Sequence, residues 1–271
     1  MRHGGRLRDL AAGLAAIMIS SGSAFAAPCG DGADGFETWK KQFAQEAAAH
    51  GVAPRALDAL SQTRYASKTI AADRGQKSFK LTLDEFMQKR GANAIISRGK
   101  RMKEKHAGLL TGIERQYGVP AGPLLAIWGM ETGFGGFLGN QHILSAVATL
   151  AYDCRRSEFF TGHLYAALTL IERGMLDASA IGAAHGEIGQ TQFLPGNVLR
   201  YGTDGDGNGR IDMIGSVPDA LASTANFLRA HGWQAGAGYQ PGQPNFVALQ
   251  GWNAASVYQQ AIALIAEKID N

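Results

Sequence analysis

The sequence predicts a mostly α-helical protein with long glycine-rich loops. Apolar residues recur at helical spacing along most of the chain, and no series of alternating apolar and polar residues indicates a sheet. Two segments, 182–216 and 232–252, are rich in glycine and polar residues and are expected to form shaped loops. The 271 residues are 45% hydrophobic and 18% charged, an ordinary globular composition that allows a sizeable core.

The helical pattern begins near Phe36 and continues to Gln62, with a break at Gly51-Val-Ala-Pro54. It resumes across residues 79–117, where charged residues are interleaved with apolar ones. Five later helices are expected after Pro120 and Pro123, across Ile143–Tyr152, across Glu158–Arg173, across Asp219–His231 and across Ala254–Lys268. Neither a repeat nor a linker divides residues 27–271, so we expect a single domain there.

Residues 1–26 have the pattern of a secretory signal peptide. Three arginines precede an apolar run from Leu10 to Ile19, and Ala24-Phe-Ala26 supplies a small-residue cleavage site. A retained membrane anchor is the alternative, but the apolar run is short for spanning a bilayer. Lipidation of Cys29 is disfavoured because Ala26-Ala-Pro28 matches the usual preceding pattern poorly. We therefore expect an exported protein without a transmembrane helix after cleavage.

The charge and the cysteines constrain partners and compartment. Removal of residues 1–26 takes away three Arg and one Asp, so the formal net charge falls from +3 to +1. This small excess gives no support for nucleic acid as a partner, and none is expected. Cys29 and Cys154 remain, and an even pair in an oxidising compartment is a disulfide candidate. Two free buried thiols are the alternative.

Glu131 has an unusual place in the predicted helix that follows Pro123. An apolar stripe with spacing i, i+3, i+4 and i+7 contains Leu124, Ile127, Trp128 and Glu131. Burial raises the pKa of a carboxyl group, and so does the C-terminal end of a helix. A protonated, partly desolvated Glu is suited to act as a general acid. A structural Glu paired with an Arg is an equally open interpretation.

The loop that follows residue 182 carries two side-chain amides, Gln190 and Gln192, among small residues. Small residues let a bulky ligand approach the backbone, and amides can hydrogen-bond its hydroxyl and amide groups. We therefore expect both glutamines to bind a ligand. A polar loop with a helix-starting Pro195 is the alternative interpretation.

The segment Asp204–Asp212 is similar to the start of a calcium-binding loop. Positions one, three and five of this loop hold the candidate ligands Asp204, Asp206 and Asn208. Gly209 occupies position six, but position twelve is Gly215 instead of a bidentate Glu. We expect weak binding unless Asp212 or Asp219 supplies a ligand. A polar Asp/Gly turn is the alternative.

Four motifs occur in one order along the chain: Gly-Met-Glu131-Thr-x-x-Gly135, Ala148-Thr-Leu-Ala-Tyr-x-x-Arg155-Arg156-x-Glu158-Phe-Phe, Gly189-Gln-Thr-Gln192-Phe-Leu-Pro195 and Ala230-His-Gly-Trp233. Together they resemble the membrane-bound lytic transglycosylase B family, glycoside hydrolase family 103. The resemblance runs from about residue 34 to 268. It implies a lysozyme-like helical fold and a periplasmic enzyme.

In this family the substrate is peptidoglycan, so the resemblance implies cleavage of the β-1,4 bond between N-acetylmuramic acid (MurNAc) and N-acetylglucosamine (GlcNAc). The product would carry a 1,6-anhydroMurNAc end. Glu131 falls on the family's catalytic Glu and Gln192 on its active-site Gln. Asn253 and Tyr258 fall on positions that lie on the substrate side of the family's site. Beside them, Trp252 replaces an aromatic residue that is usually Tyr. Phe227 stands where some members have an active-site Tyr, and Ala183 where some have Ser.

Ordinary glycosidases need two carboxylates, whereas this reaction needs one because the muramyl C6 hydroxyl is the attacking group. The remaining acidic candidates for a second carboxylate are Asp153, Glu158 and Glu187, of which Glu158 is expected to pair with Arg155 or Arg156. A hydrolytic muramidase and a non-catalytic peptidoglycan-binding or scaffold protein are the alternative functions. We expect that the reaction requires no cofactor. Calcium is a candidate ligand of the Asp204–Asp212 loop. Glycan strands are the expected partner, and other cell-wall enzymes are candidate partners.

Overall fold

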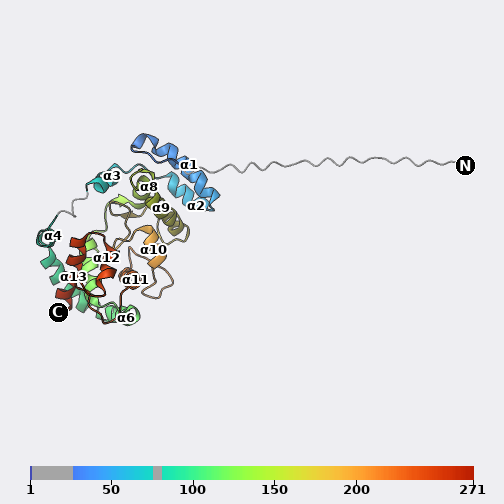
Figure 1. Ribbon diagram of the computed structural model, residues 1–271. Coiled ribbons are helices and arrows are strands. Elements are labelled where there is room, and N and C mark those ends of the chain that lie inside the picture. Colours follow the sequence, from blue (N-terminus) through green and yellow to red (C-terminus); the bar gives the residue numbers. More distant parts are fainter. Residues whose placement is uncertain (2–26, 76–80) are drawn as a thin grey trace.

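The structure is a computed structural model that describes Met1 and residues 27–75 and 81–271 (Figure 1). The predicted signal peptide therefore lies outside the described residues, apart from Met1. The helices of the described part are the 3-10 helix Ala33–Gly35, α1 Phe36–Ala49, α2 Pro54–Ser61, α3 Ser67–Arg74, α4 Leu83–Lys89, α5 Ala92–Lys105, α6 Ala107–Tyr117, α7 Ala121–Thr132, α8 Ile143–Tyr152, α9 Ser157–Glu172, α10 Pro195–Tyr201, α11 Val217–Ala230, α12 Phe246–Trp252 and α13 Ser256–Asp270. Two short antiparallel strands, β1 Gln141–His142 and β2 Ile181–Gly182, pair with each other.

The prediction of a mostly α-helical fold is confirmed, and each long helix expected from the periodicity is present within a few residues. Two expectations were wrong in detail. The segments 182–216 and 232–252 were expected to be loops, yet they contain α10 and α12. Each of these helices has seven residues, and α10 begins at Pro195, which favours a first helical turn. Helices this short bury few side chains, so they leave no detectable periodicity.

The helices form two groups that meet at the middle of the molecule (Figure 1). In one group α8 packs against α9, and α1 and α2 cover them. In the other group α13 packs along α7, and α5 contacts both. Helix α10 contacts α9 and α11, so it connects the two groups. One cluster of buried apolar residues extends through both groups, while the assignment of 27–271 as a single domain stays a prediction.

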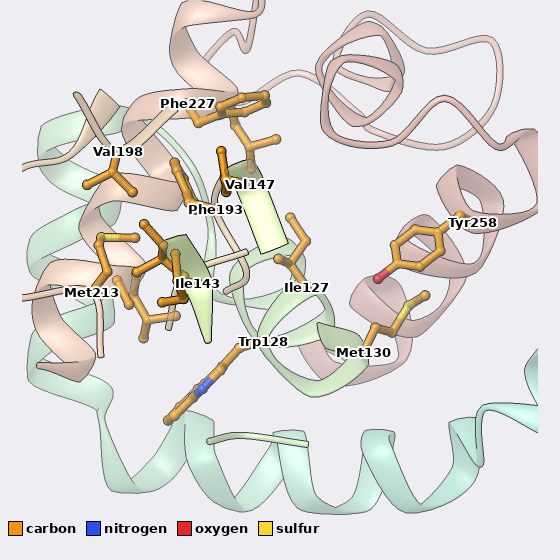
Figure 2. Close-up of a cluster of buried hydrophobic side chains, with 14 of the residues drawn as sticks. Ile127, Trp128, Met130, Ile143, Val147, Phe193, Val198, Met213, Phe227 and Tyr258 are labelled. Carbon is orange, nitrogen blue, oxygen red and sulfur yellow. The ribbon is translucent and has the colours of Figure 1, made fainter. Parts of the chain in front are cut away.

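Helix α7 lies at the centre of its group and is buried on every side. All of its residues are buried except Glu131. The sequence predicted an apolar stripe, whereas the structure shows a helix enclosed by α5, α6, α11 and α13. Figure 2 shows the neighbouring side chains, with Ile127 and Trp128 on α7 and Tyr258 on α13 directing its hydroxyl toward α7. A polar side chain on α7 is therefore surrounded by apolar groups.

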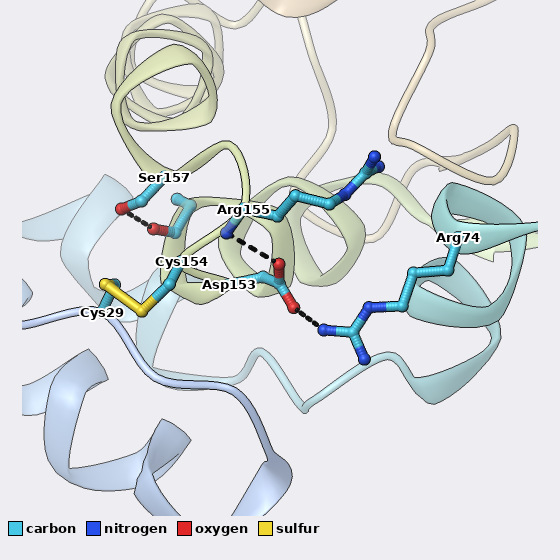
Figure 3. Close-up of a disulfide and its surroundings, with 7 residues drawn as sticks. Cys29, Arg74, Asp153, Cys154, Arg155 and Ser157 are labelled. Atoms are coloured by element: carbon cyan, nitrogen blue, oxygen red, sulfur yellow. Dashed lines mark hydrogen bonds and ion pairs between the residues drawn. A yellow bond between two sulfur atoms is a disulfide. The ribbon is translucent and has the colours of Figure 1, made fainter.

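The predicted disulfide between Cys29 and Cys154 is present (Figure 3). It fastens the first described residues to the turn between α8 and α9, where Gly30 N–H also donates to the carbonyl of Tyr152 at 3.0 Å. Asp153, next to the bond, accepts from Arg74 of α3 at 2.6 Å. Because its sulfur is in this bond, Cys29 does not suit the lipid attachment that the sequence already disfavoured.

Within residues 27–75 and 81–271, none of the helices has both the length and the apolar character that crossing a bilayer demands.

Candidate active site

Glu131 lies in the last turn of α7, where the chain leaves the core. Gly133 caps the helix in the left-handed conformation, with φ of 58°, which confirms the predicted helix end. Phe134, also left-handed with φ of 59°, then turns back to pack against Trp128. This sharp turn leaves Glu131 partly exposed at the edge of an otherwise buried helix.

The Glu131 carboxyl is held by two donors from the C-terminal helices. Tyr258 Oη donates to Oε1 at 2.6 Å, and Trp252 Nε1 donates to the same oxygen at 3.0 Å. Burial raises the pKa of Glu131 above its ordinary value. The two hydrogen bonds and the charge of Arg90 oppose this increase, and the charge of Glu187 adds to it. The predicted direction of the pKa is therefore confirmed.

Among the described residues, Glu131 forms no ion pair within 4.0 Å. The alternative interpretation, in which Glu131 is a structural acid paired with an Arg, is therefore not supported by these contacts. Both observed donors bind Oε1, and neither uses Oε2. The second carboxyl oxygen is therefore the one that can hold the proton and pass it to a ligand.

Glu131 opens into a cleft of about 260 Å³ between the C-terminal helices and the loop that precedes α10. The residues that line this cleft are Glu131, Glu187, Gln192, Phe193, Leu194, Asn197, Phe227, Trp252 and Asn253. Five of them were predicted from the sequence as site residues. Tyr258 is buried behind Glu131 and contacts its carboxyl group without lining the cleft.

Gln192 is fixed at the cleft by an unusual backbone conformation. Its φ is 58°, a left-handed value that costs free energy for a residue with a side chain. Its Nε2 donates to the carbonyl oxygens of Gly189 at 2.8 Å and Leu138 at 3.3 Å. A strained residue that lines a cleft is a candidate for ligand contact, as the sequence predicted.

Gln190 does not reach the cleft. Its Oε1 accepts from Trp128 Nε1 at 2.9 Å, and its Nε2 donates to the carbonyl of Ile214 at 2.9 Å. The Thr132 hydroxyl also donates to the Gln190 carbonyl at 2.7 Å. The Oε1 end of this amide therefore fastens the loop to α7, and the Nε2 end fastens it to the segment that precedes α11. The sequence alone could not separate Gln190 from Gln192, because both amides lie in the same short polar loop.

An aromatic cluster forms one wall of the cleft. The Trp252 ring packs edge-on against Phe193 and Phe227, with centroids 5.4 and 5.1 Å apart. His231 stacks on the far side of Phe227 at 3.9 Å. Phe227 is thus an apolar wall residue here and offers no hydroxyl to a ligand. Asn253 and Asn197 add polar groups to the lining, and Asn197 lies on α10, the helix that starts at Pro195.

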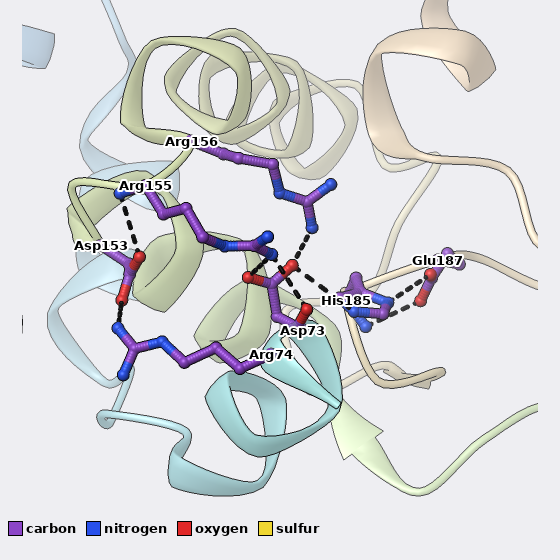
Figure 4. Close-up of polar contacts among 7 residues, drawn as sticks. All are labelled: Asp73, Arg74, Asp153, Arg155, Arg156, His185 and Glu187. Carbon is purple, nitrogen blue, oxygen red and sulfur yellow. Dashed lines mark hydrogen bonds and ion pairs between the residues drawn. The ribbon is translucent and has the colours of Figure 1, made fainter. Parts of the chain in front are cut away.

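The acidic candidates have different surroundings (Figure 4). Only Glu187 lines the cleft. Asp153 forms an ion pair with Arg74. The expected pairing of Glu158 with Arg155 or Arg156 was wrong, because both arginines bind the buried Asp73 of α3. Asp73 lies 82 residues before Arg155 in the sequence. Local spacing therefore suggested the nearby Glu158 as the partner of the arginines.

The candidate calcium loop gathers three carboxylates. Asp204, Asp206 and Asp219 each place an oxygen within 4.8 Å of the others, and Asp219 is fully buried at the start of α11. Asp212 instead accepts from the N–H groups of Ile214 and Gly215. Backbone N–H groups donate to Asp204 and Asp219 and offset part of the repulsion among the three carboxylates. A cation between them would offset the rest, and oxygen ligands suit calcium. Asn208 accepts from the N–H of Arg210 at 2.9 Å.

The sequence pattern of the family described as "Transglycosylase SLT domain" matches residues 35–243, which is most of the chain. This chain belongs to the transglycosylase SLT domain family. The match includes Glu131, Glu187 and Gln192, and it confirms the family resemblance that the motifs indicated.

Three known proteins are similar to this chain in sequence or in fold. Membrane-bound lytic murein transglycosylase B of Escherichia coli is 37% identical over 138 residues, which span 48% of this chain and 38% of that protein. SltB3 from Pseudomonas aeruginosa, solved in complex with NAG-anhNAM-pentapeptide, has a TM-score of 0.80 at 30% identity, covering 87% of this chain and 80% of that one. Escherichia coli Slt35 in complex with calcium has a TM-score of 0.76 at 23% identity, covering 90% and 96%.

Proposed function

We propose that this protein is a periplasmic lytic murein transglycosylase that cleaves the β-1,4 bond between MurNAc and GlcNAc and leaves 1,6-anhydroMurNAc ends. The proposal depends mainly on the position and the raised pKa of Glu131. Glu131 is a carboxyl with a raised pKa at the edge of an apolar helix, and it opens into a cleft within a transglycosylase SLT domain. A group of this kind donates a proton to a leaving oxygen at neutral pH.

The reaction needs only this one acid and base. Protonated Glu131 gives its proton to the glycosidic oxygen while the bond from that oxygen to the muramyl C1 breaks, and the electron pair goes to the oxygen. The muramyl C6 oxygen then bonds to C1, and its proton passes to the Glu131 carboxylate. The anhydro ring closes and Glu131 regains its starting state, so no water is consumed.

The lining of the cleft suits a sugar ligand. The Trp252 and Phe227 rings contribute apolar surface to the lining, while Gln192, Asn253 and Asn197 offer amides to hydroxyl and acetamide groups. The relative from Pseudomonas aeruginosa was solved with NAG-anhNAM-pentapeptide, whose anhydro sugar has the form of the proposed product. We assign Gln192, Asn253, Trp252 and Phe227 to substrate contact and Tyr258 to support of Glu131.

Digestion of murein sacculi tests the proposal directly. Purified mature protein is expected to release soluble muropeptides that mass spectrometry identifies as 1,6-anhydro products. A hydrolytic muramidase would give hydrated reducing ends, which are heavier by one water. A non-catalytic scaffold would bind the sacculi and release no fragments. Either outcome would overturn the proposed reaction.

Two further assignments belong to this proposal. The first is export by the signal peptide of residues 1–26, for which N-terminal sequencing of periplasmic protein should begin at Ala27. The second is calcium bound by Asp204, Asp206 and Asp219, with Asn208 as an additional oxygen ligand. Calcium would stabilise the loop between α10 and α11, which lies outside the reacting groups.

A further inference from the structure

Glu187 is the second acidic residue in the cleft, and the single-acid reaction gives it no task. It lies in the loop between β2 and α10 and lines the same cleft as Glu131. Its side chain is 22% exposed, so it is partly desolvated while still open to a ligand. Its negative charge is one of the causes that raise the pKa of Glu131. The two carboxyl groups therefore interact electrostatically within one site.

Both oxygens of Glu187 are held in place by His185. The ring Nδ1 lies 2.9 Å from Oε1, and the His185 backbone N–H donates to Oε2 at 2.8 Å. Because an ionised carboxylate can only accept, Nδ1 carries the proton. Burial alone would raise the pKa of Glu187, but the hydrogen bonds and charge of His185 outweigh it, so its pKa lies below the ordinary value. Glu187 is thus a fixed anion and a weak base.

Asp73 lies behind the His185 ring, on the side away from Glu187 (Figure 4). Nε2 of His185 is buried without a hydrogen-bond partner and lies 3.8 Å from Oδ1 of Asp73. Asp73 is buried on α3 and binds the guanidinium groups of Arg155 and Arg156. The ring therefore lies between two carboxylates. Polar groups therefore extend from α3 past His185 to the cleft, with no hydrogen bond between Asp73 and the ring.

We propose that Glu187 is a second functional carboxylate of this site, which stabilises the positive charge that develops on the muramyl ring, and that His185 is its positioning residue. This inference rests on the proposed function. Glycosidic cleavage passes through an oxocarbenium-like state with positive charge near C1. A preorganised anion in a partly desolvated cleft stabilises such a charge without any proton transfer. The same anion adds to the increase in the pKa of Glu131, of which burial is the largest cause.

Substitution of Glu187 by Gln removes the charge and keeps the size of the side chain. We expect kcat on soluble glycan substrate to fall by roughly a hundredfold, as for other losses of preorganised electrostatic stabilisation. The pKa of Glu131 should fall as well, so the alkaline limb of the kcat/KM profile should move to lower pH. Glu187→Asp keeps the charge and should leave that limb near its wild-type position.

The other groups around these carboxyls are unchanged in the variants. Glu131 faces Tyr258 on α13 and Arg90 after α4, besides Glu187 itself. Glu187 faces His185, with Asp73 and its two arginines behind. A shift of the alkaline limb is therefore attributable to the lost charge. His185→Asn should lower kcat by roughly tenfold with little change in KM, because it removes the ring contact that positions Glu187 and helps to keep its pKa low.

A purely structural role would give a different result. Glu187→Gln would then lose melting temperature while its kcat at the pH optimum stayed near the wild-type value, and that result would overturn the inference. Glu158→Gln, an exposed glutamate of α9 outside this cleft, is the matched control and should retain wild-type kinetics. If Glu187→Gln has full activity while Glu131→Gln has none, this inference fails and the proposed function stands. Full activity of Glu131→Gln would contradict the proposed function itself.

Discussion

Tyr258 Oη and Glu131 Oε1 lie 2.6 Å apart and join α13 to the last turn of α7. Burial raises the pKa of Tyr258 well above 10, and the neighbouring Glu131 adds to this increase. Tyr258 therefore keeps its proton and acts as the donor. Its hydrogen bond favours the ionised form of Glu131 and opposes part of the effect of burial. In the proposed reaction this contact would influence how readily Glu131 accepts a proton back after donating one.

Tyr258→Phe should therefore raise the pKa of Glu131. The alkaline limb of the kcat/KM profile is expected to move to higher pH, opposite to the shift expected for Glu187→Gln. Return of the proton to Glu131 would remain possible, but its alignment would be lost, and kcat should fall by roughly tenfold, as for a hydrogen bond to a charged group. Trp252→Phe removes the second donor and should shift the limb in the same direction. A shift to lower pH in Tyr258→Phe would contradict this assignment.

Glu131→Gln keeps the shape of the side chain and removes the transferable proton. Sacculus solubilisation should fall by roughly a hundredfold or more, as for the loss of a general acid. Because the pKa of Glu131 is higher in the folded state, folding stability declines as pH rises from the unfolded pKa to the folded pKa. The variant lacks this penalty, so its melting temperature should equal or exceed that of the wild type above this range. A large loss of stability would instead indicate a structural acid.

The Cys29–Cys154 disulfide closes a loop with a sequence separation of 125 residues. Restriction of the unfolded chain by a loop of this length stabilises the folded state, so Cys29→Ser with Cys154→Ser should cost about 3 to 5 kcal/mol of unfolding free energy. Urea denaturation measures this difference. Alkylation of exported protein without reductant should find no free thiol, and modification of both cysteines would refute the pairing in the cell.

Calcium should raise the melting temperature of the wild-type protein. At a concentration about a hundred times Kd, the stabilisation expected is about 2.7 kcal/mol, and a chelator should reverse it. Asp206→Asn changes an exposed ligand and should abolish the response with little change in calcium-free stability. Magnesium serves as the control cation, because it tolerates such a flexible oxygen site poorly. An equal response of Asp206→Asn would place calcium elsewhere.

Much of the fold and part of the site were predictable because they depend on local sequence. The helix Ile143–Tyr152 was predicted with the bounds observed, since a run of ten residues shows its own periodicity. Glu131 was predicted because it interrupts an apolar helix next to a terminating glycine. The disulfide was predictable because only two cysteines were present. Helices α10 and α12 were missed because seven residues are too few for a pattern.

The sequence by itself determined the helical class, the family motifs and the residue types gathered near Glu131. The tertiary structure alone decided which of two neighbouring amides faces the cleft, because Gln190 is engaged by Trp128 and Ile214 from distant segments. It also decided that Asp73, not Glu158, binds the two arginines, and that Asp219 lies beside Asp204 and Asp206 in the candidate calcium loop. These partners are set by packing between helices far apart in the chain, and local spacing carries no information about such contacts.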